Sequence, residues 1–387
     1  MNIAIFTSTY LPVIGGIQFE LYWLLKAIDN IFQSKGIKRF IFIVPHYQNQ
    51  SYLNFKNIEV VEIDIYLSSK KHTIPCLYQL SKIIRQYEID LINCFTITPD
   101  GFYCACLKLM HRTPFIITSQ GVDLAMDKRF NYGARLIKRI SILTNIILKQ
   151  MKSMITISDD MKNFAIDAGV DLKRITVIPN GIELNQSAAR DTTGVENELK
   201  KKYDISDSHI IFITLSGMRK IKGHVNLVKA FALAVKSNPN FRLFIGAYGA
   251  ETENLKALVS ELNIEHFVKF IGFVSDDQKM AWLNLAHVYC NTAYFEPFGI
   301  VYIEAIKHQL AVLGSIKGGA RDIFQHGQSA HLIDPESIEQ IYEGMLSLND
   351  ESYRTLLVKN AETLLPLYDI NRIANMYLST YIKNIGK

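Results

Sequence analysis

The chain has 387 residues, more than one ordinary hydrophobic core accommodates, and this length favours two domains. Apolar residues make up 49% and charged residues 20%, which is the composition of a folded globular protein and excludes a disordered chain. The net charge of +5 is too small to argue for nucleic acid, and no zinc-finger, RRM or helix-turn-helix pattern is present. A basic balance suits other anions, such as nucleotide phosphates or an acidic membrane surface.

The cysteines and the first residues indicate a cytoplasmic protein. The five cysteines are an odd number without metal-ligand spacing, so we interpret them as free thiols in a reducing compartment. The N-terminal sequence MNIAIFTSTYLPV lacks the charged region and the long apolar region of a signal peptide. No uncharged apolar run of about 18 residues occurs, so we expect no membrane span.

Short apolar runs alternate with helical patterns along the first half of the chain. The first run, 2–8, ends in small polar residues, as a buried parallel strand does. Strands that alternate with helices predict an open parallel sheet with helices on both faces. The further strands are expected at 40–45, 58–65, 90–95, 114–121, 153–158 and 175–181.

A polar stretch at 185–209 interrupts this alternation and predicts a linker followed by a surface helix. We expect two doubly wound, Rossmann-like α/β domains, 1–188 and 189–365, with a helix in 366–387 that packs back on the first. Ligands of such sheets bind at the carboxyl ends of the strands, so a cleft between two facing domains is the expected site. The second-half strands are expected at 210–217, 241–249, 268–274, 288–294, 310–315 and 330–334.

Two loops between predicted strands and helices suit a phosphate ligand. Gly15 and Gly16 precede the first helix, where the backbone can approach an anion, although no GxGxxG dinucleotide motif is present. The segment SGMRKIKGH (216–224) places Arg219 and Lys222 in one turn, where cations repel each other unless an anion binds between them. Taken alone, the glycine pair could be a turn without a ligand and the basic segment a solvated loop.

The nonapeptide EPFGIVYIE (296–304) also follows a predicted strand. We expect a helix to start at 298–300, where free amide groups would face a ligand, with Glu304 about one turn inside it. A carboxylate there can accept two hydroxyl groups of a ribose, and Glu296 would lie near a sugar. Taken singly, Glu304 is better explained as a surface acid that compensates the helix dipole, and the basic segment at 216–224 weakens that explanation. No HExxH or DxD pattern occurs, so we expect no metal.

Eight segments of the chain, in their order, resemble the retaining glycosyltransferases of family 4, which have the GT-B fold. They are GGIQ, QGVD, ISDDM, VIPNGIE, RKIKGH, FIGFV, EPFGIVYIEA and KGGARDIFQHG. The resemblance covers nearly the whole chain, and the Glu-x7-Glu element at Glu296 and Glu304 is its most specific part. It implies sugar transfer from a nucleotide diphosphate donor, with retention at the anomeric carbon and without a metal or other cofactor. A UDP-sugar is the favoured donor and a GDP-sugar the second.

The resemblance also implies roles for individual residues. Arg219 and Lys222 resemble the pair that neutralises the donor diphosphate in place of a metal, and Glu296 resembles the acid close to the donor sugar. Glu304 resembles the ribose ligand, and the segment from Gly272 to Val274 resembles the one that lines the base. The remaining expected donor contacts are Gly16, Gln120, Phe298, Gly299 and Ile300.

Two positions depart from the family pattern. Members often carry Arg where Gly217 stands here, so Arg219 substitutes for it by proximity. The family usually has His in place of Gln120, before Gly121, and that His touches the donor sugar. Glutamine can still donate a hydrogen bond but cannot carry charge, so we expect the contact to survive with an altered sugar preference.

Residues 128–154 combine seven cations with an apolar face of Ile and Leu. Such a segment can lie on an anionic membrane surface, which would place the enzyme on the inner face of the membrane and suit a lipid-linked acceptor. An ordinary domain helix with a solvated basic face explains the same pattern. The cations are Lys128, Arg129, Arg135, Lys138, Arg139, Lys149 and Lys152.

Three functions compete at this point. The leading interpretation is a hexosyltransferase that builds a bacterial surface polysaccharide, lipopolysaccharide or another lipid-linked glycan. A GT-B epimerase or hydrolase of a nucleotide sugar is an alternative, but the extra acid and base residues of such enzymes are not identifiable here. A non-catalytic nucleotide-sugar-binding subunit is suggested by Gln120. The presence of both cations, Arg219 and Lys222, together with Glu296 and Glu304 argues against such a subunit, because a scaffold needs no desolvated pair of cations.

Overall fold

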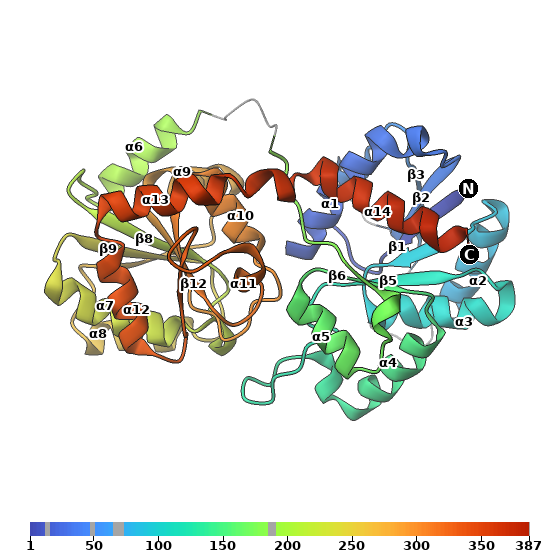
Figure 1. The fold of residues 1–387 in the computed structure, drawn as a ribbon, viewed down its shortest axis with the longest axis horizontal. Coiled ribbons are helices and arrows are strands. Elements are labelled where there is room, and N and C mark those ends of the chain that lie inside the picture. Colours follow the sequence, from blue (N-terminus) through green and yellow to red (C-terminus); the bar gives the residue numbers. More distant parts are fainter. Residues whose placement is uncertain (12–15, 47–50, 65–72, 185–190, 387) are drawn as a thin grey trace. The chain divides into compact units, whose positions relative to one another are not determined.

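The computed structural model describes residues 1–11, 16–46, 51–64, 73–184 and 191–386. The chain divides into two compact units (Figure 1). Unit 1 comprises Met1–Glu183 and Tyr368–Lys387, and unit 2 comprises Leu184–Leu367. The divisions therefore fall a few residues from the expected bounds at 188 and 365. Each unit has its own hydrophobic core.

Unit 1 contains a seven-stranded sheet in the order β3-β2-β1-β4-β5-β6-β7, in which all neighbours are parallel. The chain leaves β1 toward one edge of the sheet and returns to β4 on the other side, which makes a switch point between β1 and β4. The strands are β1 (Asn2–Phe6), β2 (Arg39–Pro45), β3 (Glu59–Ile63), β4 (Leu91–Cys94), β5 (Phe115–Ser119), β6 (Met154–Thr156) and β7 (Ile175–Val177).

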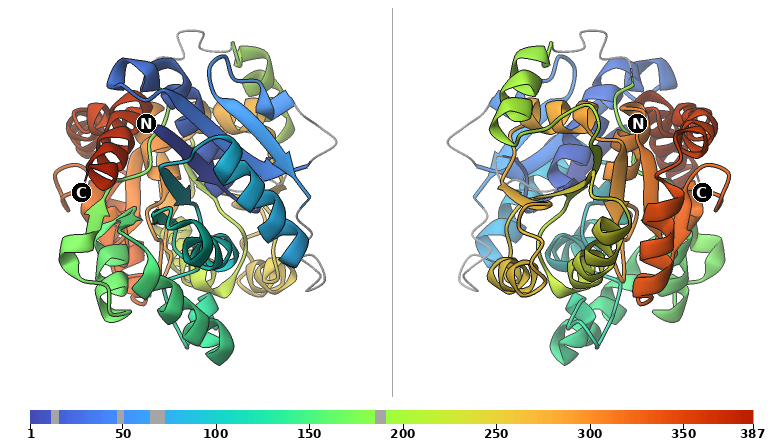
Figure 2. Two further views of the ribbon diagram at one scale, coloured as in Figure 1. Left: turned by 90° about the vertical axis from the view of Figure 1, so that its right-hand side faces the viewer. Right: turned by 90° about the vertical axis from the view of Figure 1, so that its left-hand side faces the viewer.

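Helices cover both faces of this sheet (Figure 2). Side chains alternate along β1, so that Ile3 and Ile5 join the core under α1 and α14, while the ring of Phe6 contacts Tyr103 of α3. The C-terminal helix α14 packs against α1, and the Asp369 side chain caps its first turn by accepting two backbone N–H bonds. The helices of unit 1 are α1 (Gly16–Ile31), α2 (Thr73–Gln86), α3 (Phe102–His111), α4 (Lys138–Gln150), α5 (Asp159–Asp167) and α14 (Ile370–Ile385).

Unit 2 contains a six-stranded parallel sheet in the order β10-β9-β8-β11-β12-β13, with its switch point between β8 and β11. The strands are β8 (Ile210–Leu215), β9 (Phe241–Gly246), β10 (Val268–Gly272), β11 (Val288–Asn291), β12 (Ala311–Ser315) and β13 (His331–Ile333). The helices are α6 (Thr193–Lys202), α7 (His224–Ser237), α8 (Thr252–Glu261), α9 (Asp276–Leu285), α10 (Ile300–Lys307), α11 (Ala320–Ile323), α12 (Ile338–Ser347) and α13 (Glu351–Glu362).

The two sheets confirm the expected α/β class with two doubly wound, Rossmann-like units. Every expected strand overlaps an observed strand, and the polar stretch after residue 184 leads into α6 as a helix. Of the expected linker, residues 185–190 lie outside the described residues, as does Gly15.

Candidate functional site in unit 2

The loops that follow β8 and β11 leave the sheet side by side at its carboxyl edge, because these two strands are neighbours and parallel. Two contacts hold these loops together: the backbone N–H of Tyr294 donates to Ile221 O at 2.8 Å, and Thr292 Oγ1 donates to Gly223 O at 3.2 Å. Gly223 has a φ of +68°, and a Cβ there would lie 1.9 Å from Thr292 O. Only glycine therefore allows this approach.

The basic turn and the acidic nonapeptide meet at Lys222 and Glu296. Lys222 Nζ lies 2.7 Å from Glu296 Oε2, and each of these side chains is 13% exposed. The Asn291 Nδ2 group donates to the same carboxylate oxygen at 3.3 Å. Partial burial strengthens this ion pair relative to one in water and restrains both side chains. The structure thus brings two of the three predicted catalytic residues into direct contact.

Arg219, the third, is exposed at the start of the same turn. Behind this turn His224 is buried, with its Nε2 atom 3.1 Å from Ser216 Oγ. Burial, with a smaller contribution from Lys222, lowers the pKa of His224 to about 4, so its imidazole stays neutral at physiological pH. The charge of this turn therefore comes from its Arg and Lys side chains.

The second predicted acid, Glu304, lies within the first two turns of α10 and makes its own ion pair. Its Oε1 atom lies 2.6 Å from Nζ of Lys279 in α9. Gly299 is the N-cap residue of α10 with a φ of +86°, and no described side chain caps this helix. The amides of the first turn at Ile300 therefore suit an anion or a hydroxyl oxygen. The Phe298 side chain is buried, so only its backbone could face a ligand.

A glycine pair after β12, which we did not predict as part of the site, supports the nonapeptide. Gly318 pairs with Glu296 as an isolated parallel bridge, and Gly319 N donates to Glu296 O at 2.8 Å. A Cβ on Gly318 would lie 2.2 Å from Glu296 O, and one on Gly319 would lie 2.5 Å from the Cα of Phe298. The pair belongs to the segment KGGARDIFQHG, which was part of the family resemblance. Its contact with residue 296 could not be predicted, because it depends on β12 lying beside β11.

The predicted base-lining residues lie further along the same edge. Gly272 ends β10, which is separated from β11 by β9 and β8. Its φ is +71°, and a Cβ would lie 2.5 Å from Oη of Tyr248. Tyr248 and Phe273 are exposed aromatic side chains in the loops after β9 and β10, whereas Val274 is half-buried. Sequence reasoning did not identify Tyr248, because the predicted strand 241–249 included it, whereas β9 ends two residues before it.

The other predicted donor residues belong to unit 1. Gly16 is exposed and opens α1. Gln120 is buried in the loop after β5, where its Nε2 group donates to Glu20 Oε2 at 2.7 Å and its Oε1 atom accepts from Asn180 Nδ2 at 3.4 Å. Neither Glu20 nor Asn180 was predicted as a site residue.

Two family models match consecutive parts of the chain. Glycosyltransferase Family 4 matches residues 32–186, and Glycosyl transferases group 1 matches residues 195–364. The chain belongs to the family 4 glycosyltransferases. The resemblance found in the sequence motifs is thereby confirmed.

Two relatives of this glycosyltransferase and one solved structure are distant in sequence and similar in length. The N-acetyl-alpha-D-glucosaminyl L-malate synthase of Bacillus anthracis is 22% identical over 347 residues, which cover 87% of this chain and 86% of the relative. The alpha-monoglucosyldiacylglycerol synthase of Streptococcus pneumoniae is 21% identical over 399 residues, covering 99% and 87% respectively. The Anabaena protein HepE, solved in complex with UDP and glucose, matches with a TM-score of 0.79 at 18% identity over 99% of this chain and 100% of HepE. This likeness shows the GT-B fold.

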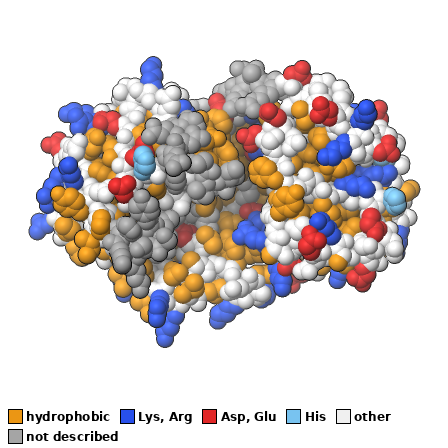
Figure 3. Space-filling view, turned by 180° about the vertical axis from the view of Figure 1, so that it is seen from behind, with side chains coloured by type: hydrophobic (Ala, Val, Ile, Leu, Met, Phe, Trp, Pro, Cys, Tyr) orange, Lys and Arg blue, Asp and Glu red, His pale blue; other side chains and the backbone are white. Residues whose placement is uncertain are grey.

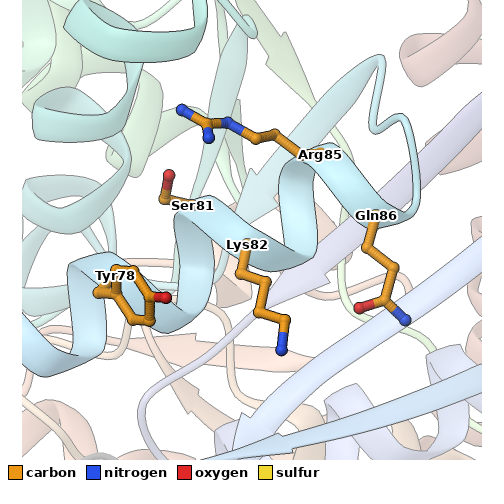
Figure 4. Close-up of a pocket in the computed structure, with 5 residues that line it drawn as sticks. All are labelled: Tyr78, Ser81, Lys82, Arg85 and Gln86. Carbon is orange, nitrogen blue, oxygen red and sulfur yellow. The ribbon is translucent and has the colours of Figure 1, made fainter.

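A separate hollow of about 400 Å³ lies along α2 of the glycosyltransferase (Figure 4). It is lined by Tyr78, Ser81, Lys82, Arg85 and Gln86, all from one helix. This helix runs toward the amino end of β4, away from the carboxyl edge, so the hollow is not part of the predicted donor site. Within the described ranges, no three His, Cys, Asp or Glu side chains gather into a set that could hold a metal ion.

Proposed function

We propose that this glycosyltransferase moves a hexose from a nucleoside diphosphate sugar to a glycan or lipid-linked acceptor, with retention at the anomeric carbon and without metal. The observation that carries the proposal is the partly buried Lys222–Glu296 ion pair at the switch point of unit 2. It places a cation for phosphate beside an acid for sugar. The proposed setting is bacterial surface polysaccharide or lipopolysaccharide synthesis in the cytoplasm.

The ammonium group of Lys222 would stabilise the leaving nucleotide. It has three N–H donors, of which one is directed at Glu296, and the others can reach phosphate oxygens. As the bond between the anomeric carbon and the phosphate oxygen breaks, negative charge grows on the diphosphate and the fixed cation becomes more effective. The acceptor oxygen forms its new bond on the face of the sugar from which the diphosphate leaves, and the acceptor's hydroxyl proton passes to the departing diphosphate oxygen.

The remaining donor contacts follow the carboxyl edge of unit 2. Glu304 would accept hydrogen bonds from ribose hydroxyls, with Lys279 holding its carboxylate in place. The exposed rings of Tyr248 and Phe273 would stack on the base beside Gly272 and Val274. Uracil is the favoured base, and the UDP bound by HepE supports that preference.

The acceptor is proposed to bind mainly to unit 1, which also provides Gly16 and Gln120. The name of the alpha-monoglucosyldiacylglycerol synthase fits a lipid acceptor, whereas the N-acetyl-alpha-D-glucosaminyl L-malate synthase is named for a small hydroxy acid, which lies outside the proposed range.

Titration of the purified protein with UDP, GDP and ADP tests the donor proposal. We expect UDP to bind in the presence of EDTA, with a dissociation constant of about 1–100 μM, as is common for enzyme substrates. Incubation with a UDP-hexose should release UDP only when a glycan or lipid acceptor is added, and NMR of the anomeric proton of the transferred sugar should show the donor configuration. Failure of all three nucleotides to bind would contradict the proposal. Binding with acceptor-independent cleavage would favour the hydrolase, and binding without turnover the non-catalytic subunit.

The second part of the proposal is a peripheral membrane contact through the exposed stripe of α4. Arg139, Ile142, Ile146 and Lys149 follow helical spacing on one exposed face, and Ile137 and Lys138 extend it. Figure 3 shows hydrophobic and basic side chains beside one another along the lower edge of unit 1. Apolar side chains flanked by cations suit an anionic bilayer surface.

Two cations of the expected 128–154 segment do not belong to this surface. Arg135 is buried and directs its guanidinium to Leu124 O at 3.5 Å, and Lys152 Nζ donates to the backbone oxygen of Asn384 in α14. Their prediction as membrane-facing residues is wrong, because both point into unit 1. No helix in the described part of the chain is both long and apolar enough to cross a bilayer.

Co-sedimentation with vesicles of phosphatidylglycerol and phosphatidylcholine tests the membrane contact. We expect binding at low salt that falls as ionic strength rises, because surface charges are screened. The double variant R139E/K149E should lose most of this binding, since each cation near an anionic surface contributes about 1 kcal/mol. The matched variant K201E/K236E changes two exposed lysines of unit 2 and should bind as the wild type does. Equal loss in both variants would leave only a general charge effect.

A further inference from the structure

An acidic side chain that neither the motifs nor the proposed function uses lies buried in α1. Glu20 is 2% exposed, and its Oε1 atom has no hydrogen-bond partner among the described residues. Its Oε2 atom accepts the 2.7 Å hydrogen bond from Gln120. A buried carboxyl group without a neighbouring cation is costly in its charged form. A glutamate at this buried position of α1 is therefore unusual unless its carboxyl group has a role.

The contact with Gln120 continues to a second side chain. Gln120 is itself buried, and its Oε1 atom accepts from Asn180 in the loop after β7. Glu20 therefore holds the amide nitrogen and Asn180 the amide oxygen. With both ends engaged, the amide cannot flip end over end without losing two hydrogen bonds.

The surroundings of Glu20 favour its neutral form. Burial raises its pKa to about 8, and only the hydrogen bond from Gln120 opposes that shift. The titratable groups that face it are Tyr377 and Tyr381 of α14, whose own pKa values burial raises, so both remain neutral. The buried carboxyls of Asp100 and Asp123 lie in the neighbouring loops of unit 1 and are held by backbone and hydroxyl donors.

We propose that Glu20 is a positioning residue that orients the Gln120 amide for its sugar contact. The amide nitrogen of Gln120 carries two hydrogens. One is donated in the hydrogen bond to Glu20, and this bond fixes the direction in which the other can be donated to the sugar. A neutral acid does this without placing a negative charge beside a sugar–phosphate donor. The inference rests on the proposed contact between Gln120 and the donor sugar, and it assigns Glu20 a role that acts through Gln120 alone.

Two substitutions at position 20 separate positioning from packing. Glu20→Gln keeps the shape and an oxygen that accepts from Gln120, so we expect kcat/KM within about twofold of the wild type. Glu20→Leu fills similar space without hydrogen bonding, and we expect kcat/KM to fall about tenfold, the equivalent of one lost hydrogen bond. In a Gln120→Ala background, Glu20→Leu should cause no further loss, because the residue through which it acts is gone.

The pH dependence of unfolding provides a readout that needs no enzyme activity. The pKa of Glu20 rises from 4.5 to about 8 on folding, so only the unfolded chain releases this proton between those values. The contribution of Glu20 to stability is therefore complete below about pH 4.5 and declines as pH rises toward 8. Glu20→Gln should remove this decline, so its melting temperature should gain on the wild type from pH 5 to 8. Because burial also raises the pKa of Asp100 to about 7, the difference between the two proteins is the measurement.

The outcomes decide the inference separately from the proposed function. If Glu20→Leu lowers kcat/KM equally with and without Gln120, or if Glu20→Gln is as impaired as Glu20→Leu, Glu20 has no positioning role. If the wild type transfers no sugar, the proposed function fails, and melting of the four Glu20→Leu and Gln120→Ala combinations still measures the coupling. Additive melting shifts there would overturn the inference.

Discussion

Replacing Lys222 by alanine is expected to lower kcat/KM for sugar transfer by about 10²–10³-fold, as for other fixed groups that stabilise transition-state charge. Lys222 is half-buried, paired with Glu296 at 2.7 Å, and lies where the loops after β8 and β11 meet. Its loss removes the partly buried cation that we propose faces the leaving group. Steady-state kinetics with a UDP-hexose, beside circular dichroism to verify the fold, checks this expectation.

Lys229→Ala is the matched control. Lys229 is exposed on α7, seven residues beyond Lys222 in the same unit, and should leave transfer unchanged. Arg219→Ala should fall between the two, because an exposed guanidinium is screened by water and salt. Unchanged turnover in Lys222→Ala, with the fold intact, would remove the diphosphate role from this residue.

The fold could be predicted because its signal is local and repeated. The buried strands are short apolar runs, as in Asn2–Phe6 and Ile210–Leu215, and most are followed by a helical pattern that allows a parallel return. The expected strand ends were too long at residues 7–8 and 216–217, where small polar residues turn into loops. Burial does not mark the end of β1 either, because the loop residues Thr7 and Ser8 are also buried.

The site could be predicted in part. Lys222, Glu296 and Glu304 stood out because their residue types, in family order, suit a sugar nucleotide. The ion-pair partner of Glu304 could not be read in the same way, since Lys279 lies on another helix, α9, and meets Glu304 only in the folded chain. The same holds for Glu20, which meets Gln120 across 100 residues of sequence. Contacts of this kind depend on the tertiary fold.

Gly318→Ala is expected to disable the site through the backbone. The added Cβ would lie 2.2 Å from Glu296 O, and backbone atoms cannot move aside as a flexible side chain can. The loop that carries Glu296 must then shift away from Lys222, and a displacement of about 1 Å near a reacting group can lower the rate about 10²-fold. We expect kcat/KM to fall about 10²-fold and the free energy of unfolding to fall by about 2–3 kcal/mol.

Gly327→Ala separates this clash from simple backbone strain. Gly327 also has a positive φ, +71°, but a Cβ there would meet nothing within 4 Å. Alanine in a left-handed conformation costs about 1–2 kcal/mol by itself, so Gly327→Ala should lower the free energy of unfolding by that amount and leave transfer intact. Chemical denaturation and kinetics of both variants give the comparison. Equal kinetic losses would mean that strain anywhere in unit 2 disturbs the site, whereas a loss confined to Gly318→Ala would show that the glycine pair after β12 holds Glu296 against Lys222.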